Sequence, residues 1–424
     1  MELKNDIYVL NYSNKNIVYS PLRRALFFAD SSSCSIINRY KNNCINDGDK
    51  DSLVWEHIKN LESIPITVPN VNQIYKSTHV VIIPTQLCNL GCTYCYAKNA
   101  HLHNSVISKQ LLQTILDFII KQPPKKKRIS FIGGGEPLIA WDLIKWSVDY
   151  LNTNKNENDI LDIGVTTNAT LFTDDIFQYL KEHDIHVGVS FEILPDIQNV
   201  QRPFLGGNRS SFDVVNQNIQ NMIQHGIRYS IRSTITKLNV HRMSEMVEFV
   251  AKHYPNIRKL HLEQVTDKLE DAYSFYDEYI SSFYKAKQLG KQYQIDVYNS
   301  ISKSIYYTKY SFCNGELCIT PTGSIVACHR VSEEHESAFP LFNYGKVTEN
   351  GIYFFNEAEK KIIDFSRLKS DLCTNCFAKW HCGGICPMER SELPQKQILA
   401  KCEFIKKIIL RELYDSLIEK LNNI

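Results

Sequence analysis

The chain has 424 residues, of which 43% are hydrophobic and 22% charged, and its formal net charge is +2. This length and composition are typical of a globular protein with two or three cores, and the near-neutral charge excludes a general attraction to nucleic acid or to anionic membranes. No run approaches the ~20 apolar residues of a membrane helix, and the start MELKNDIYVL lacks a secretory signal pattern, so we expect a cytoplasmic protein without a membrane partner.

Residues 1–75 predict a small separate α+β unit. Its predicted strands lie at 6–12, 15–20 and 23–30, and its predicted helices lie at 31–42 and 53–61. The first two strands flank a polar turn and predict a hairpin, and a serine run gives the first helix a capped start. A proline-containing linker, SIPITVPN, follows the second helix.

Strands and helices alternate from residue 78 to about residue 291. Candidate strands lie at 78–85, 128–134, 160–168, 186–193, 227–236 and 257–265, and candidate helices lie at 108–121, 139–153, 173–184, 212–225, 241–253 and 271–291. The strands are apolar on both faces, as parallel strands under covering helices are. Six such units predict an α/β fold, an open or partial (β/α)6 barrel of the TIM type, with functional groups at the carboxyl ends of its strands.

Cysteine-rich loops replace this alternation after residue 310, and residues 397–421 predict one long amphipathic helix. The chain has 13 cysteines, and a cytoplasmic location favours metal or cluster ligation over disulfides for them. Cys34 and Cys44 stand outside the cysteine clusters, so we expect them to be plain thiols.

Three cysteines follow the first strand of the alternating region, Cys88, Cys92 and Cys95 in the run CNLGCTYC. A four-iron cube normally takes four thiolates, so three cysteines leave one iron open to another ligand, whereas a zinc loop is the alternative for this spacing alone. The spacing, with Tyr94 before the last cysteine, resembles the radical S-adenosylmethionine (SAM) family. The resemblance implies that the open iron binds SAM and that an electron from the cluster releases a 5′-deoxyadenosyl radical, which takes hydrogen from a substrate.

Further segments at strand ends resemble motifs of the same family, in the same order. FIGGGEP is similar to the family's GGEP element, which implies that Gly134, Gly135 and Glu136 lie at the SAM amino group. TTNAT resembles the family's TNG segment, which implies contacts of Thr167 and Asn168 with the methionine or ribose part of SAM. For each of these residues alone, a structural role at a strand end is the alternative.

Four more residues are assigned by this resemblance. Ser190 resembles a serine that ends the fourth strand, and Arg232 resembles a fifth-strand residue that pairs with the SAM carboxylate, for which a guanidinium is well suited. Tyr94 or Tyr96 is expected to pack on adenine, with core packing as the alternative. Glu192 stands near the place of a substrate-binding Asp in many relatives, which makes it a candidate catalytic replacement.

The C-terminal cysteines resemble the SPASM extension, which implies two auxiliary [4Fe–4S] clusters and therefore three clusters in all. By this resemblance, Cys313, Cys328 and Cys386 hold the first auxiliary cluster, and Cys373, Cys376, Cys382 and Cys402 hold the second. Cys318 is either a further ligand of the first cluster or a buried strand thiol, and without a fourth ligand this cluster keeps an open iron. A pair of structural zinc sites is the alternative to the clusters.

The resemblance divides the chain into an N-terminal domain (1–75), a radical SAM core (76–305) and a SPASM domain (306–424). Anaerobic sulfatase maturases carry an Asp directly after the cysteine that matches Cys328, and this Asp acts as a base. Here the residue is His329, which also accepts protons near neutral pH. This difference favours a ribosomal-peptide maturase that oxidatively cross-links or similarly modifies a precursor peptide.

The resemblance also implies partners for this activity. The N-terminal domain resembles the winged-helix unit that pairs a leader peptide with a strand edge, and a structural cap over the barrel is the alternative. The expected partners are the precursor peptide and a reducing electron donor such as ferredoxin or flavodoxin, without nucleic acid. Two rival functions stay open, a sulfatase-maturing enzyme that makes formylglycine and a non-catalytic zinc or iron–sulfur scaffold.

Overall fold

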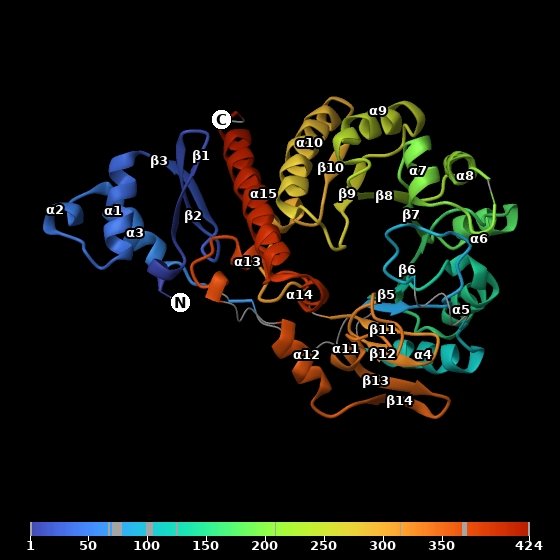
Figure 1. Cartoon of the computed structure of the whole chain (residues 1–424). Coiled ribbons are helices and arrows are strands. Elements are labelled where there is room, and N and C mark those ends of the chain that lie inside the picture. The colour runs from blue at the N-terminus through green and yellow to red at the C-terminus, as the bar shows by residue number, and fades with distance from the viewer. Residues whose placement is uncertain are drawn as a thin grey trace.

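The computed structural model describes residues 2–66, 68–69, 79–98, 105–123, 126–207, 209–313, 315–366 and 371–422. Figure 1 shows a small N-terminal unit on one side, a large sheet covered by helices on the other, and the C-terminal helix α15 (Gln395–Asn422) between them. The expected domain boundary at residue 75 and the start of the strand at residue 78 lie outside the described residues. Among the described residues, no helix has the length and apolar character needed to cross a membrane.

The N-terminal unit consists of an antiparallel three-stranded sheet followed by helices, as expected. Its elements are β1 (Tyr8–Tyr12), β2 (Lys15–Ser20), β3 (Ala25–Ala29), α1 (Ser31–Lys41), α2 (Asp47–Lys50) and α3 (Leu53–Ser63). Ser13 and Asn14 have φ values of 48° and 58°, the conformation of a tight hairpin turn. Val18, Ile37 and Ile58 form a core of this unit that is separate from the large core.

Within the described residues, eleven strands form one sheet in the order β10-β9-β8-β7-β6-β5-β4-β11-β12-β13-β14. These strands are β4 (His79–Ile82), β5 (Lys126–Phe131), β6 (Ile160–Thr167), β7 (His186–Ser190), β8 (Tyr229–Ile235), β9 (Lys259–Gln264), β10 (Asp296–Tyr298), β11 (Leu317–Ile319), β12 (Ser324–Val326), β13 (Asn343–Thr348) and β14 (Gly351–Phe354). Strands β4 to β11 pair in parallel, and β12 to β14 continue the sheet antiparallel to one another. The expected α/β fold with a parallel sheet is confirmed.

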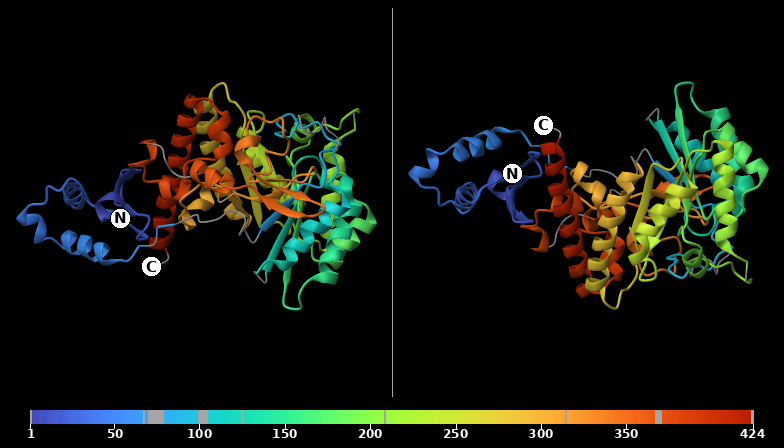
Figure 2. Two further views of the ribbon diagram at one scale, coloured as in Figure 1. Left: turned by 90° about the horizontal axis from the view of Figure 1, so that it is seen from below. Right: turned by 90° about the horizontal axis from the view of Figure 1, so that it is seen from above.

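The helices of the core follow the predicted ranges closely, with one addition. They are α4 (Lys109–Lys121), α5 (Trp141–Asn154), α6 (Asp174–Glu182), α7 (Pro195–Gln201), α8 (Ser211–His225), α9 (Met243–His253) and α10 (Ala272–Gln292). The sequence did not predict α7, because its seven residues begin with a proline and span fewer than two turns of a repeating apolar pattern. Figure 2 shows the core helices along the sheet in two further views.

The C-terminal segment continues the sheet instead of forming a separate layer. Strand β11 lies beside β4, with Cys318 opposite Val81 and Ile319 opposite Ile82. Its short helices are α11 (Phe339–Phe342), α12 (Ala358–Ser366), α13 (Lys379–Cys382) and α14 (Pro387–Glu392), and α15 packs along α10. The strand before the three-cysteine loop and the strands next to Cys313 and Cys328 therefore belong to one sheet.

Helix α15 also connects the core to the N-terminal unit. It contacts β1 and β3, and Arg411 of the helix donates a hydrogen bond of 3.1 Å to the hydroxyl of Tyr12. A second connection joins the hydroxyl of Tyr19 to Nε2 of His381, which is buried in the C-terminal segment. The N-terminal unit is thus held by the C-terminal half of the chain.

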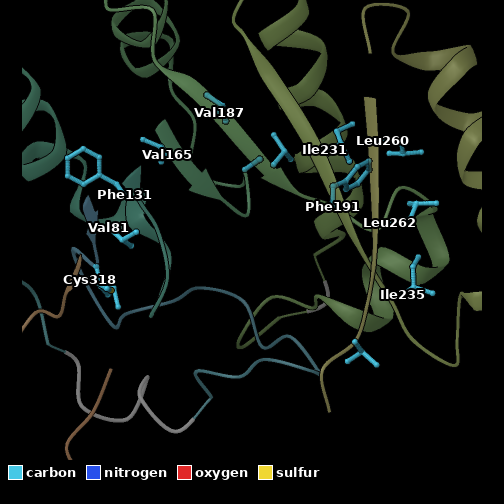
Figure 3. Close-up of a cluster of buried hydrophobic side chains, with 14 of the residues drawn as sticks. Val81, Phe131, Val165, Val187, Phe191, Ile231, Ile235, Leu260, Leu262 and Cys318 are labelled. Carbon is cyan, nitrogen blue, oxygen red and sulfur yellow. The ribbon is translucent and has the colours of Figure 1, made fainter. Parts of the chain in front are cut away.

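Buried aliphatic and aromatic side chains fill the space between the sheet and its helices. Figure 3 shows part of this core, including Val81, Phe131 and Val165 from neighbouring parallel strands. Cys318 belongs to the same cluster and is fully buried. Its surroundings are therefore those of a core thiol.

Candidate active site

The three-cysteine loop follows β4 and is held by an arm of the chain that begins at the last residue of α7. The arm consists of residues 201–205 and pairs with residues 89–93 of the loop. The amide of Gly91 donates to the carbonyl of Pro203 (2.8 Å), and the amide of Thr93 donates to the carbonyl of Gln201 (2.9 Å). The amide of Leu205 donates in turn to the carbonyl of Asn89 (3.0 Å). Backbone hydrogen bonds thus fix the loop without using its cysteines.

The three thiols of this loop lie near enough to influence one another. Burial raises the pKa of Cys88 to about 12, and Glu136, Cys92 and Cys95 add to the rise. Burial also raises the pKa of Cys92, while the cation of Arg202 acts in the opposite direction. Thiols of this kind become thiolates when iron binds them, so a set of three on one loop fits a cube with one open iron.

The glycine-rich turn after β5 lies against the other side of the loop. The amide of Gly135 donates to the carbonyl of Thr85 (2.9 Å), and the amide of Glu136 donates to the carbonyl of Leu87 (2.7 Å). A Cβ at Gly135 would lie only 1.8 Å from the Leu87 oxygen, and one at Gly134 would lie 2.3 Å from Oε1 of Gln86. The visible role of these two glycines is therefore to let the turn meet the cluster loop, and their contact with SAM stays a prediction.

Glu136, Thr167 and Asn168 come together where β5 and β6 end. Oε1 of Glu136 accepts hydrogen bonds from the hydroxyl of Thr167 (2.6 Å) and the amide of Leu138 (3.0 Å), and Oε2 accepts from the amide of Asn168 (2.7 Å). Burial raises the pKa of Glu136, although these hydrogen bonds oppose the rise. The side chain of Asn168 donates to Oδ1 of Asn89 (2.9 Å), which connects this group to the cluster loop.

Ser190 and Arg232 are neighbours on β7 and β8, opposite each other in the parallel register. Arg232 is exposed, and its side chain has no recorded ion pair or hydrogen bond among the described residues. Its charge helps His261 lower the pKa of the buried Glu263 to about 2, against the effect of burial. A guanidinium in this position is available to a carboxylate ligand.

Glu192 and Tyr94 belong to a buried network beside the loop. The Glu192 carboxylate is fully buried and accepts hydrogen bonds from Nε of Arg202 (2.8 Å), the hydroxyl of Ser233 (2.7 Å), the amide of Thr234 (2.9 Å) and the hydroxyl of Tyr94. These contacts are internal, so the substrate contact expected of Glu192 and the adenine contact expected of Tyr94 stay predictions. The sequence did not predict Arg202, because a single arginine in QNVQRPF carries no pattern.

The C-terminal cysteines lie in two groups. Burial raises the pKa of Cys328, and Glu316 and the thiols of Cys386 and Cys313 add to the rise, which places these three cysteines together. Cys318 is also close to Cys328, but it lies within the core strand β11.

The second group surrounds Cys402. Burial raises the pKa of Cys402 to about 12, and the thiols of Cys382, Cys373 and Cys376 add to the rise. No three His, Cys, Asp or Glu side chains of the described residues converge on a site the size of one ion. A cube holds its thiolates at separate irons, so both groups remain candidates for clusters.

His329 lies between the first C-terminal group and the cluster loop. Its Nδ1 is 2.9 Å from Oε2 of Glu316, and its amide donates to the same oxygen at 2.8 Å. Its ring meets the ring of Tyr96 edge-on, with centroids 5.9 Å apart. The base role expected of His329 stays a prediction, and its place next to both cysteine regions is compatible with it.

Comparisons with known proteins place this site in a family. Residues 82–251 match the model of the radical SAM superfamily. An uncharacterized protein, MJ0907 of Methanocaldococcus jannaschii, is 32% identical over 41% of this chain and 58% of its own length. The radical SAM cyclopropyl synthase TigE of Paramaledivibacter caminithermalis is 23% identical over 91% of this chain and 83% of its own length.

Sulfatase-maturating enzymes and solved structures are also similar to this chain. The cysteine-type anaerobic sulfatase-maturating enzyme of Clostridium novyi is 23% identical over 71% of this chain and 85% of its own length. The structure of anSMEcpe with bound AdoMet covers 81% of this chain and 99% of its own, with 16% identity and a TM-score of 0.69. Streptococcus suis SuiB bound to its precursor peptide SuiA covers 90% of this chain and 94% of its own, with 14% identity and a TM-score of 0.52.

Radical SAM enzymes use SAM and a [4Fe–4S] cluster, and the three thiols of the loop after β4 fit that cluster. Because the matching relatives are catalytic radical SAM enzymes, the alternative of a non-catalytic zinc or iron–sulfur scaffold is wrong. Residues 82–251 of this chain belong to the radical SAM superfamily, and the chain is a radical SAM enzyme.

Proposed function

We propose that this enzyme is a peptide maturase, which takes hydrogen from a ribosomally made precursor peptide and installs an oxidative cross-link or a similar modification. The observation that carries the proposal is the extent of the likeness. The matches to TigE and SuiB cover 91% and 90% of the chain, so the uncovered part is smaller than the N-terminal unit. The match to the Clostridium novyi sulfatase-maturating enzyme covers 71%. SuiB is a protein that binds a precursor peptide.

Cys88, Cys92 and Cys95 would hold the SAM-binding cluster, and Arg232 would pair with the SAM carboxylate. The remaining proposed SAM contacts are Tyr94, Gly134, Gly135, Glu136, Thr167, Asn168 and Ser190. Bound there, SAM and its cluster supply a 5′-deoxyadenosyl radical that takes one hydrogen atom from the substrate. The exposed guanidinium of Arg232, which lies on β8 opposite the end of β7 and has no ion pair with any residue that the structure describes, supports this placement.

A new bond in the peptide requires the loss of a second electron and a proton after the hydrogen atom is removed. The two C-terminal cysteine groups would hold auxiliary clusters that accept this electron, and His329 would accept the proton. Glu316 supports this role because its contact at Nδ1 leaves Nε2 of the ring to face a substrate. Cys318 lies in the core, which favours a first auxiliary cluster held by protein thiols at three irons only.

The N-terminal unit would hold the leader of the precursor peptide. Its strands β1 and β3 are both edge strands, and an edge strand offers unpaired backbone groups to a peptide. The connections of Tyr12 and Tyr19 to the C-terminal half would keep a bound leader at a constant place relative to the core.

The test is anaerobic reconstitution, followed by coexpression with a precursor peptide encoded next to this gene. We expect three cubes of iron and sulfide per chain, 5′-deoxyadenosine formed from SAM, and a peptide product lighter by two hydrogens. A matched control is the variant with alanine at all three cysteines of the loop after β4. An unmodified peptide in the presence of active SAM cleavage would contradict the peptide proposal while leaving the radical SAM site intact.

A sulfatase-maturing activity is the second candidate, because the anSMEcpe structure has the higher TM-score, 0.69 against 0.52 for SuiB. This candidate predicts that a sulfatase-derived peptide with cysteine or serine at its modification site becomes a formylglycine peptide. Mass spectrometry of both peptides after the same reaction distinguishes the two functions.

A further inference from the structure

A buried ion pair lies directly beside the proposed cluster ligands. Arg202 and Glu192 form it with an Nε to Oε1 distance of 2.8 Å, and their side chains are 11% and 0% exposed. The other end of the guanidinium reaches the cluster loop, because its Nη1 lies 3.7 Å from Sγ of Cys92. One cation therefore contacts both a buried carboxylate and a cysteine of the loop.

The surroundings hold this guanidinium in place from several sides. Its carbon lies 5.3 Å from the centroid of the Tyr94 ring, and the Tyr94 hydroxyl donates to the same carboxylate. Arg202 is also part of the arm that is hydrogen-bonded to the cluster loop through Gly91 and Thr93. Displacement of the arm that carries Arg202 relative to Cys92 would thus break backbone hydrogen bonds.

We propose that Arg202 and Glu192 are a positioning pair that sets the reduction potential of the SAM-binding cluster, with Arg202 raising it and Glu192 limiting the increase. The inference rests on the proposed ligands Cys88, Cys92 and Cys95.

The physical reason is charge. Reduction of the cluster adds one negative charge, and a nearby cation that hydrogen-bonds a ligand sulfur stabilises the reduced form. A buried carboxylate disfavours the same form, and burial strengthens both effects because little water screens them. Arg202 contacts the sulfur itself, whereas Glu192 is bonded to the far side of the guanidinium, so the cation has the larger effect.

This arrangement gives the two partners opposite effects, which a purely structural ion pair does not predict. Arg202→Met removes the cation and leaves the carboxylate, so the midpoint potential of the cluster falls. Glu192→Gln keeps a polar side chain of the same shape and removes the anion, so the potential rises. Arg202→Lys keeps the positive charge but loses the planar guanidinium with its several N–H donors. The midpoint potential of its cluster therefore lies between those of the wild type and Arg202→Met.

The experiment is a redox titration of the reconstituted full chain, followed by electron paramagnetic resonance. The reduced signal that changes when SAM is added identifies the relevant cluster, and iron and sulfide counts check that it is assembled. The matched control is Lys127→Met, which removes the cation of another buried ion pair, Lys127 with Asp159 (3.3 Å), at the start of β5. We expect no shift in this control.

Opposite shifts for Arg202→Met and Glu192→Gln, with full iron content and an unshifted control, support the proposal. Unchanged potentials, or shifts in the same direction, overturn it. If Arg202→Met does not assemble its cluster, the other two variants give the test: a rise in potential for Glu192→Gln with a fall for Arg202→Lys supports the proposal, and any other result overturns it. A wild-type protein with full iron content but no SAM-sensitive signal would contradict the proposed ligands of the SAM-binding cluster. A SAM-sensitive signal whose potential does not shift in the variants would contradict only the ion-pair proposal.

Discussion

The backbone of Gly135 lies directly against the backbone of the cluster loop at Leu87, so we expect the substitution Gly135→Ala to disturb the site. The added Cβ would lie 1.8 Å from the carbonyl oxygen of Leu87 and 2.4 Å from its carbonyl carbon. Both are backbone atoms, so no side-chain rotation relieves the overlap. Ordinary contact begins at 3.4 Å, so the two loops must separate by about 1.6 Å (3.4 − 1.8).

That separation would break the hydrogen bond from the amide of Glu136 to the carbonyl of Leu87, which is 2.7 Å long. Overpacking of this kind destabilises a protein by about 1–3 kcal/mol. A displacement of roughly 1 Å in a catalytic group lowers a rate by about 100-fold. We therefore expect SAM cleavage by Gly135→Ala to fall about 100-fold, with a lower melting temperature.

The assay is the rate of 5′-deoxyadenosine formation, measured by chromatography, together with the melting temperature of the anaerobic protein. The matched control is Gly164→Ala in β6, where the nearest atom to an added Cβ is the carbonyl oxygen of His186 at 3.5 Å. This control should keep the wild-type rate. If Gly135→Ala also cleaved SAM at the wild-type rate and melted normally, the close approach of the two loops would be refuted.

Three further substitutions test the other parts of the structure. Alanine at all three cysteines of the loop after β4 should abolish SAM cleavage and remove one third of the iron, because the two proposed auxiliary clusters would have separate ligands; continued cleavage would refute the site. Cys318→Ala should keep the full iron count, whereas Cys328→Ala should lose iron, and a loss in both would make Cys318 a ligand. Tyr19→Phe leaves Nε2 of His381 without its partner and should lower the free energy of unfolding by about 1–3 kcal/mol in a denaturant titration. Tyr8→Phe is its control, because the buried hydroxyl of Tyr8 has no hydrogen-bond partner within the described part of the chain, and equal losses in the two variants would contradict the role of the Tyr19 contact.

The regular elements could be predicted from the sequence because their apolar patterns are long enough to read. Strand β6 spans eight residues and α10 spans 21, and both lie where the pattern placed them. Strand β10 has only the three residues Asp296–Tyr298, so it carries too little pattern to separate it from a loop. The same applies to β11, whose pairing with β4 depends on a contact between distant parts of the chain.

The candidate site could be predicted only in its local parts. The spacing of the three cysteines and the glycine-rich turn are visible within a few residues, but Arg202 is 110 residues from Cys92, and only the folded chain brings them together. The sequence predicts that Glu192 contacts the substrate, because it stands near the place of a substrate-binding Asp in many relatives. The backbone turns at Ile193, whose φ is 70°, and the carboxylate lies in the buried network with Arg202.

The pairing of β11 with β4 brings together two cysteine regions that are distant in the sequence. The strands are held in register through Val81 and Cys318, and the amide of Ile83, at the start of the cluster loop, donates to the carbonyl of Ile319 (2.9 Å). Tyr96, the residue after Cys95, meets the ring of His329, the residue after Cys328. The spacing between the two regions is therefore set by a hydrogen-bonded sheet and by packed rings. Because a hydrogen-bonded sheet resists shear far better than a linker does, the proposed electron acceptor at the second region would stay at a constant distance from a substrate radical formed at the first, without a closure of domains.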